Sequence, residues 1–166
     1  IELPKMKLVE EIEDVREVAE AFKLDLEDLD AELKPAVIDA GIRAMVIPVR
    51  EKAVLKKMEP KRRRMARLTE KYGCQCFHLF SYDGDGCVVQ RNFAPAAGIW
   101  EESGTGTASG AMYAYLKEKN RLARRKITCS QGEEIGRPSE IVLDEIDGAI
   151  YVGGKACVVM EGIMRI

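Results

Sequence analysis

The chain lacks the features that mark membrane, secreted or nucleic-acid-binding proteins. Its longest apolar runs, residues 44–49 and 157–160, fall far short of the ~20 residues that cross a bilayer, so we expect neither a membrane segment nor a signal peptide. Neither charge dominates, because 26 lysines and arginines balance 28 acidic residues, and the surface as a whole has no reason to attract nucleic acid or acidic lipid. The composition therefore favours a small molecule as the partner, with no nucleic acid and no membrane.

Cysteine and histidine are too few and too scattered to indicate a disulfide framework or a metal site. The five cysteines form an odd, irregularly spaced set, which predicts reduced thiols and a cytoplasmic protein. Cys74, Cys76 and the single histidine, His78, would share one face of a strand, but structural zinc prefers paired Cys-x-x-Cys ligands, which are absent. Buried thiols and a packed histidine are therefore favoured over a metal centre, and we expect no metal.

The 166 residues, 46% of them hydrophobic, are enough for one compact domain or for one half of a two-domain enzyme. Apolar residues at helical spacing alternate with short β-branched runs bounded by glycines, which predicts a mixed α+β domain dominated by antiparallel strands. The expected elements are a helix over Glu13–Phe22, two strands or one kinked strand around Gly41 in Ala36–Arg50, helical structure over Glu51–Tyr72, a hairpin over 75–95 that turns at Asp83–Gly86, a helix over Thr107–Leu116, and short strands within 126–132, 139–154 and 156–166.

The predicted helix Thr107–Leu116 carries no charged side chain and consists mostly of small residues. Such a helix is buried on all sides, so the unpaired N–H groups and the positive dipole end at its start would suit a bound carboxylate or phosphate. Gly104 and Gly106 would let the backbone approach that anion, and the hydroxyls of Thr105 and Thr107 could donate to it or cap the helix. A purely structural cap with a tight glycine turn explains the same residues equally well.

Two adjacent acids, Glu101 and Glu102, precede the glycine turn. At least one carboxyl group should therefore lie beside the anion site, where it could remove and return a proton of the bound molecule. The alternative is that both acids only offset the positive end of the helix, an effect of ~0.3–1 kcal/mol. We expect one of the two, not both, to act in catalysis.

Two basic clusters, Lys56–Lys71 and Arg121–Lys126, raise the alternative of nucleic-acid binding. The first cluster is interleaved with Met65, Leu68 and acidic residues at helical spacing, and no aromatic platform lies beside it. A solvated helix face is therefore favoured over a nucleic-acid surface.

Three stretches resemble one known family. Residues 91–116, "RNFAPAAGIWEESGTGTASGAMYAYL", are similar to the Arg-x-Phe-x-Pro and Gly-Ile-x-Glu-Asp-Pro-x-Thr-Gly-Ser-Ala signature of PhzF-like (phenazine biosynthesis) proteins, which have the diaminopimelate epimerase fold. The stretches "QGEEIGRPSEIVL" and "IYVGGKACVVMEGIMRI" resemble later strands of the same family. The resemblance covers nearly the whole chain, with its specific motifs confined to Arg91–Ile166.

The resemblance implies one half of a two-domain isomerase or epimerase, in which a curved, mostly antiparallel and barrel-like sheet wraps around a central apolar helix. Residues 1–166 would be the C-terminal domain. The N-terminal half, which supplies the family's catalytic glutamate and a substrate-binding histidine, would be absent from this chain. The implied reaction moves a carbon-bound proton on a small carboxylic acid, in a biosynthetic process and without a cofactor, and the implied assembly is a homodimer.

The family's active-site residues fall on the stretch between the two acids and the helix. Its aspartate matches Glu102, which is the implied catalytic residue. The implied substrate-binding residues are Ser103, Gly104, Thr105, Gly106, Thr107 and Arg91.

Two positions qualify this assignment. Ser103 stands where the true epimerase has its acid cysteine. Because a serine hydroxyl is a far weaker acid than a thiol, two-thiol racemisation is not expected, and one-base proton relocation on a small acid stays open. Arg91 could pair with the substrate or with Glu101, and a structural ion pair is favoured. A degenerate family member that binds a small acid or a partner chain without catalysis is the alternative function.

Overall fold

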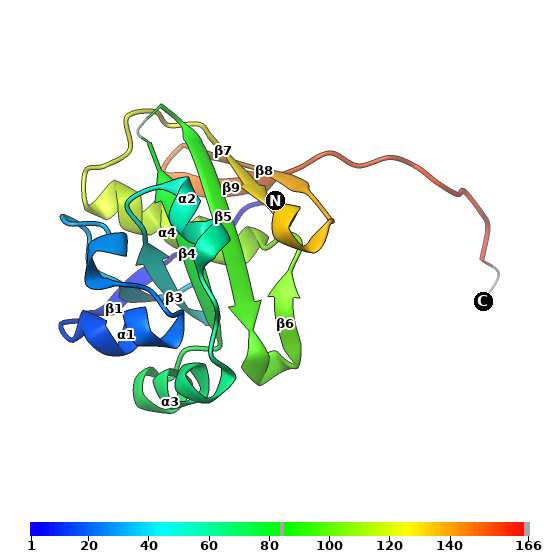
Figure 1. The fold of residues 1–166 in the computed structure, drawn as a ribbon. Helices are drawn as coiled ribbons and strands as arrows, with labels where there is room; N and C mark the ends of the chain where they lie inside the picture. Colours follow the sequence, from blue (N-terminus) through cyan, green and yellow to red (C-terminus); the bar gives the residue numbers. More distant parts are fainter. Residues whose placement is uncertain (84, 165–166) are drawn as a thin grey trace.

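The computed structural model describes residues 1–83 and 85–164, which form a strongly curled β-sheet with helices packed on both of its faces (Figure 1). The strands are β1 (Lys7–Glu11), β2 (Ala36–Asp39), β3 (Arg43–Pro48), β4 (Cys76–Tyr82), β5 (Cys87–Ala94), β6 (Ile99–Glu102), β7 (Ile127–Gln131), β8 (Ser139–Ile146) and β9 (Ala149–Gly153). The α-helices are α1 (Val15–Ala21), α2 (Lys52–Lys57), α3 (Arg62–Tyr72) and α4 (Gly106–Glu118).

The strand order is β1-β2-β3-β4-β5-β7-β8-β9, with β6 attached to β5. The pairs β3–β4 and β5–β7 are parallel, and the other pairs are antiparallel. Parallel neighbours need a long crossover connection; α2 and α3 lie in the first crossover, and β6 and α4 lie in the second. The predicted α+β fold, a mostly antiparallel curved sheet around a central helix, is confirmed.

Residues 1–6 connect β9 and β1, the two outer strands of the sheet. The N–H of Leu3 donates to Ile150 O at 2.8 Å, and the N–H of Val152 donates to Ile1 O at 2.8 Å, so the start of the chain pairs with β9. The chain then continues into β1, which pairs with β2. This segment therefore spans the gap that the curled sheet would otherwise leave between its edges.

Alternating side chains give each face of the sheet its own core. On one face α1, α2 and α3 pack against strand residues such as Met45 and Phe77. On the other face α4 packs against alternate positions of the same strands, such as Ala44 and Cys76. The buried central helix predicted from its lack of charge is confirmed, because these side chains of α4 are at most 1% exposed: Ala108, Ala111, Met112, Tyr113, Tyr115 and Leu116.

Most of the predicted elements are found in the structure. The helical region after Arg50 consists of two helices, because the chain between α2 and α3 contains Pro60, and proline ends a helix at the preceding residue. The turn of the hairpin includes Gly84, which lies outside the described residues.

The strand expected over 156–166 is wrong for residues 156–164, which run as an irregular, exposed segment away from the body (Figure 1); residues 165–166 lie outside the described residues. The apolar side chains of this tail have no cover in the described structure, and Val159 and Ile163 are 89% and 93% exposed. A strand requires a neighbour for its backbone hydrogen bonds. The composition here is that of a strand, but no neighbouring strand is present within the described residues to pair with it.

Candidate active site

Three polar side chains lie in a row across neighbouring strands. In the strand register His78 of β4 is opposite Asn92 of β5, and Asn92 is opposite Glu102 of β6. Residues opposite each other in a sheet project from the same face. His78 Nδ1 lies 3.2 Å from Asn92 Oδ1, and Asn92 Nδ2 donates to Glu102 Oε2 at 3.3 Å. The row therefore connects the sheet interior to Glu102.

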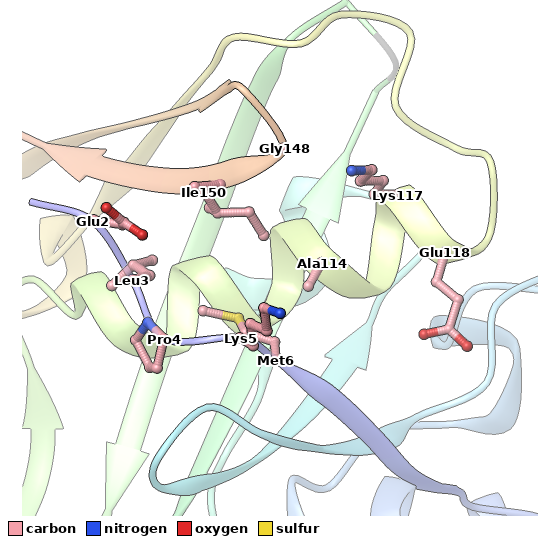
Figure 2. Close-up of a pocket in the computed structure, with 11 residues that line it drawn as sticks. Glu2, Leu3, Pro4, Lys5, Met6, Ala114, Lys117, Glu118, Gly148 and Ile150 are labelled. Carbon is pink, nitrogen blue, oxygen red and sulfur yellow. The ribbon is translucent and has the colours of Figure 1, made fainter.

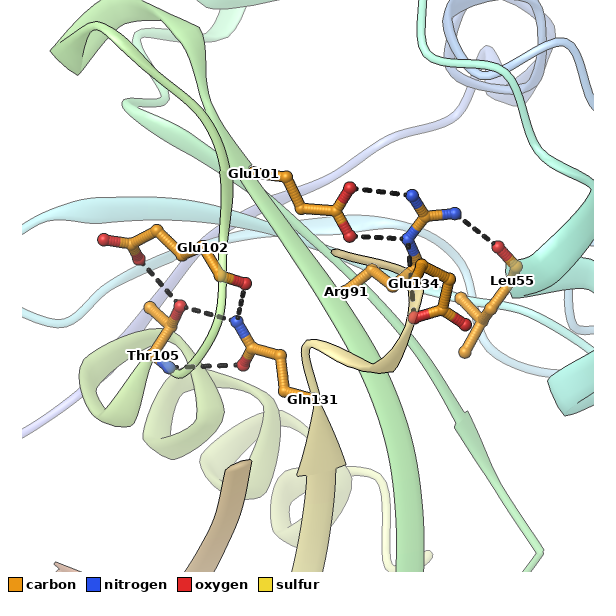
Figure 3. A network of polar contacts seen from close by, with 7 residues as sticks. All are labelled: Leu55, Arg91, Glu101, Glu102, Thr105, Gln131 and Glu134. Atoms are coloured by element: carbon orange, nitrogen blue, oxygen red, sulfur yellow. Dashed lines mark hydrogen bonds and ion pairs between the residues drawn. The ribbon is translucent and has the colours of Figure 1, made fainter. Parts of the chain in front are cut away.

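Glu102 is tied to the start of α4 through one carboxylate oxygen. Its Oε2 also accepts a hydrogen bond from Thr105 Oγ1 at 2.7 Å, and Figure 3 shows the other carboxylate oxygen pointing away from the network. The side chain is half-buried. One oxygen is thus held by two hydrogen bonds, and the other points away from the network.

Gln131, at the end of β7, holds the turn between β6 and α4. Its Nε2 donates to the backbone oxygen of Glu102 at 2.8 Å and to Thr105 Oγ1 at 3.0 Å. Its Oε1 accepts the backbone N–H of Thr105 at 3.2 Å (Figure 3). A single buried amide therefore fixes the position of the helix start relative to Glu102.

The N-terminus of α4 has no side-chain cap among the residues that the structure describes. Thr105 is the N-cap residue, but its hydroxyl donates to Glu102 instead of accepting from the first turn. The structural cap considered from the sequence is therefore not formed here. Gly106 and Thr107, in the first turn, are half-buried, and their N–H groups lie at the positive end of the helix dipole, where an anion is favoured.

Both glycines of the turn pack against the chain's own strands. A Cβ atom on Gly106 would lie 3.2 Å from Val152 Cγ2 of β9, and one on Gly104 would lie 3.1 Å from Ser139 Oγ of β8. Tight packing against β8 and β9 is therefore one reason for glycine at these positions, beside the access for an anion expected from the sequence. Ser103 is half-buried between Glu102 and this turn.

Arg91 and Glu101 form a separate, buried ion pair. Arg91 Nε and Nη2 each donate to a carboxylate oxygen of Glu101 at 2.8 Å, and Nη1 donates to the backbone oxygen of Leu55 at 2.7 Å (Figure 3). Only 5% of the Glu101 side chain is exposed. These residues alternate along their strands with Asn92 and Glu102 and so project from the opposite face. The structure thus shows the ion pair between Arg91 and Glu101 that was favoured from the sequence. This ion pair lies on the opposite face of the sheet from Glu102.

Sequence reasoning missed the buried amides of the network and set His78 aside. Gln90 Nε2 donates to Ser109 Oγ at 2.6 Å and to Gln131 Oε1 at 2.9 Å, and Gln90 Oε1 lies 3.1 Å from His78 Nε2. Burial lowers the pKa of His78 to about 4, although the amides of Asn92 and Gln90 act in the opposite direction. The available signal was the pair Gln90 and Asn92, which are two residues apart in β5 and therefore project from the same face of the sheet.

The thiols and carboxylates do not gather around a metal position in the part of the chain that the structure describes. Cys76 and His78 lie in β4, whereas Cys74 precedes the strand and its thiol contacts the backbone oxygen of Leu68. In the same residues no helix combines the length and the apolar surface needed to cross a bilayer.

A cavity of ≈ 590 Å³ lies between the first residues of the chain, the C-terminal half of α4 and the start of β9 (Figure 2). Its lining includes Met6, Ala114, Lys117 and Ile150. Neither Glu102 nor Thr105 contributes to it. The cavity and the polar network at the start of α4 are therefore separate features of the molecule.

Comparison with known proteins identifies relatives along the whole chain. The PhzC-PhzF family model, described as phenazine biosynthesis-like protein, matches residues 1–162. An uncharacterized isomerase from Deinococcus radiodurans is 34% identical over 157 residues, which are 89% of this chain and 51% of that protein. An uncharacterized isomerase from Bacillus subtilis is 29% identical over 84% of this chain and 50% of that protein. The chain thus spans about half the length of these curated relatives.

Solved structures share the fold. A protein from Pseudomonas aeruginosa described as a predicted epimerase superposes with a TM-score of 0.74 at 26% identity, over 95% of this chain and 57% of that one. A phenazine biosynthesis protein of the PhzF family from Bacillus anthracis superposes with a TM-score of 0.68 at 22% identity, over 91% of this chain and 54% of that one. From the family match, the related isomerases and the shared fold, we conclude that the chain belongs to the PhzC-PhzF family of phenazine biosynthesis-like proteins.

Proposed function

We propose that this chain is the C-terminal half of an isomerase that moves a carbon-bound proton on a small carboxylic acid, without a cofactor. Glu102 exchanges the proton, and the start of α4 binds the carboxylate of the substrate. The names of the relatives, which are isomerases and a predicted epimerase, support the reaction class. The arrangement of Glu102 and α4 supports the assignment of the residues.

The observation that carries the proposal is the uncapped start of a buried helix with a carboxyl group fixed beside it. Glu102 Oε2 lies 2.7 Å from Thr105 Oγ1 at the N-cap of α4, and no described side chain caps the first turn. An anion bound at this turn would therefore lie next to the carboxyl oxygen of Glu102 that points away from the network.

The proposed chemistry follows from where charge develops. Removing a proton from the carbon next to a carboxylate shifts negative charge onto the carboxylate oxygens. The N–H groups of Gly106 and Thr107 would stabilise that charge in the transition state, as pre-positioned donors do at other oxyanion sites. Glu102 gives its proton to the carbon, or takes one from it, and the second acid–base group comes from the other half of the enzyme.

The fraction of the relatives that the chain covers supports a two-part enzyme. Because the chain spans about half the length of its curated relatives, the pocket walls and the second acid–base group would come from the N-terminal half. A homodimer of such two-domain subunits in the cytoplasm completes the proposal.

The test is hydrogen exchange catalysed by the full protein in deuterium oxide. NMR follows the loss of carbon-bound hydrogen from a panel of small carboxylic acids, with wild type, Glu102→Gln and Glu101→Gln compared. We expect Glu102→Gln to lower the exchange rate by ~10²–10⁴-fold, the usual contribution of a general acid or base.

Glu101→Gln is the matched control, because it changes the adjacent acid of the same strand, on the opposite face. It should retain exchange per folded molecule even where the ion pair with Arg91 is weakened. Equal exchange rates for Glu102→Gln and wild type would contradict the role of Glu102. Binding of an acid by wild type without exchange would favour the non-catalytic alternative.

A further inference from the structure

We propose that Asn92 is a positioning residue that couples the proton on Glu102 to the position of the proton on the His78 ring. The proposal rests on the proposed function, since it concerns the same carboxyl group. It is supported by the direction of the hydrogen bonds in one closed set of side chains, in which each side chain contacts the next. The set consists of His78, Asn92, Glu102, Thr105, Gln131 and Gln90.

One contact in this closed set of side chains fixes which groups donate and which accept. The backbone N–H of Thr105 can only donate, and it donates to Gln131 Oε1 at 3.2 Å, so the amide of Gln131 has one possible orientation. Gln131 Oε1 also accepts from Gln90 Nε2 at 2.9 Å. Turning Gln90 over would place two amide oxygens against each other. Gln90 Oε1 must therefore face His78 Nε2, 3.1 Å away.

His78 has a single proton to place between its two ring nitrogens. The ring is fully buried, and its pKa, lowered to about 4 by that burial, keeps it uncharged at neutral pH. A neutral imidazole has one N–H donor and one bare acceptor nitrogen. Because Gln90 presents an oxygen, the arrangement that satisfies this side of the ring places the proton on Nε2 and leaves Nδ1 bare.

The bare Nδ1 then requires the NH₂ group of Asn92. With the amide in that orientation, Asn92 Oδ1 faces Glu102 Oε2, and a hydrogen bond forms only when Glu102 carries its proton on Oε2. The opposite orientation, with Asn92 Nδ2 toward Glu102 at 3.3 Å and Oδ1 toward His78 at 3.2 Å, suits an ionised Glu102 and a ring proton on Nδ1. The two orientations of one amide thus correspond to two proton arrangements.

The imidazole of His78 neither gains nor loses a proton between these two arrangements. Its one proton lies on Nε2 when Glu102 carries a proton on Oε2, and on Nδ1 when Oε2 is bare. In the second arrangement the bare Nε2 faces Gln90 Oε1, a contact without a hydrogen bond. Asn92 therefore links the position of the imidazole proton to the presence of a proton on Glu102 Oε2, whereas exchange with the substrate is assigned to the other carboxyl oxygen.

Among the described residues, the other charged groups near these side chains lie on the opposite face of the sheet. Cys76 lies two residues before His78 on the same face of β4, and Cys129 lies two residues before Gln131 on β7; burial raises the pKa of each thiol to about 12. Arg91 projects from the opposite face of β5, where it pairs with Glu101 and lies 4.0 Å from Glu134. Glu102 thus carries the carboxyl group that directly contacts Asn92.

The test is the ¹⁵N NMR spectrum of the His78 ring in the full protein, whose signals distinguish a protonated from a bare nitrogen. His78 is the only histidine of this chain, and a His78→Gln sample identifies its signals. In wild type we expect the ring proton to move from Nε2 to Nδ1 as the pH is raised from just above the pKa of His78. In Glu102→Gln the hydroxyl of Thr105 still requires an acceptor, so the amide oxygen of glutamine takes the place of Oε2 and accepts from Asn92 Nδ2. The imidazole proton should then stay on Nδ1 at every pH above the pKa of His78.

A second pair of variants isolates Asn92. The ring signals of Asn92→Leu should be the same with glutamate and with glutamine at position 102, because the connection is broken. Identical ring protonation in wild type and Glu102→Gln at every pH overturns the coupling, and this comparison leaves Asn92 unchanged. Failure of the proposed function is distinguishable, since retained hydrogen exchange in Glu102→Gln removes the catalytic assignment while the ring signals still report the coupling.

Discussion

At the scale of single residues, a fully buried histidine links the stability of the protein to pH. The side chain of His78 is 0% exposed and contacts two amides. A buried ring without an opposite charge beside it favours its neutral form, because burial penalises the charged form. Burial accordingly lowers the pKa of His78 from 6.5 to about 4.

The first prediction is a loss of stability in acid that depends on this residue. Between pH 6.5 and pH 4 the unfolded chain binds a proton at His78 that the folded protein does not bind. The contribution of His78 is therefore fully present above pH 6.5, and it decreases by on the order of 3 kcal/mol as the pH falls to 4. Denaturant unfolding of wild type and His78→Gln across this range measures it.

His78→Gln should show a flatter dependence of the unfolding free energy on pH, since glutamine does not titrate. The carboxylates are the same in both proteins, so the difference between the two curves isolates the histidine. Parallel curves for the two proteins would mean that the folded and unfolded states protonate His78 alike.

Residue identity alone does not separate the roles of Glu101 and Glu102. Both are glutamates in β6, and both were candidates for the proton-transferring group. Alternation along the strand decides between them: one side chain reaches Arg91 on one face, and the other reaches Thr105 on the other face. The buried pair with Arg91 occupies Glu101, which leaves Glu102 for the proposed chemistry.

At the scale of elements, the start of the chain is held against α4 by a close approach at one glycine. A Cβ atom on Gly110 would contact Leu3 Cδ1 and would lie 2.6 Å from Met6 Cε. Residues 1–6 therefore cross the helix where Gly110 presents no side chain. The same segment lines the cavity in Figure 2 and links β9 to β1.

The second prediction is that Gly110→Ala separates this segment from the helix. Overpacking of a filled core costs ~1–3 kcal/mol; after the helix-propensity gain of alanine is subtracted, we expect a net loss of ~0–2 kcal/mol in the free energy of unfolding, together with faster amide exchange at Leu3. The added stability of alanine within a helix, ~1 kcal/mol over glycine, is smaller than or comparable to this cost. Calorimetry and hydrogen exchange provide the measurements.

A double-mutant cycle gives the control for Gly110→Ala. Leu3→Ala removes the atoms that the new methyl group meets, so the loss in the double variant should be smaller than the sum of the two single losses by at least ~0.5 kcal/mol. Additive losses would show that Leu3 and the helix do not meet in this way.

At the scale of the whole molecule, the tail and the body are structurally independent within the described residues. Residues 156–164 are exposed throughout, whereas Lys155 Nζ still pairs with Glu140 of β8 at 3.2 Å. A segment that buries little surface contributes little to folding. The stability of the sheet should therefore be set by residues up to Lys155.

The third prediction is that a chain ending at Lys155 keeps its stability. We expect the free energy of unfolding to change by no more than ~0.5 kcal/mol, the range of surface changes that leave buried features intact. Chemical denaturation of the shortened and complete chains tests this. A further cut that removes β9 (Ala149–Gly153) should be strongly destabilising, because β9 pairs with β8 and packs against α4; a large loss from the first cut alone would contradict the prediction.

Most elements of the fold could be predicted from the sequence because their signals are local. Helical spacing identified α1, and alternation around Gly41 identified β2 and β3. The absence of charge identified α4 as a central, buried helix, since no side of it could face water. The strand in the tail was predicted wrongly because a strand also needs a neighbouring strand to pair with. The composition of the tail does not show whether such a neighbour is present.

By itself the sequence determined which residues surround the start of α4, because Glu102 to Thr107 are consecutive and a short turn cannot separate them. The tertiary structure alone decided which oxygen of Glu102 is fixed, and that His78, Asn92, Gln90 and Gln131 complete the network. These side chains come from β4, β5 and β7, whose neighbours are set by strand register and crossover topology. Register depends on packing of the entire sheet, so contacts between strands distant in sequence cannot be obtained from local patterns.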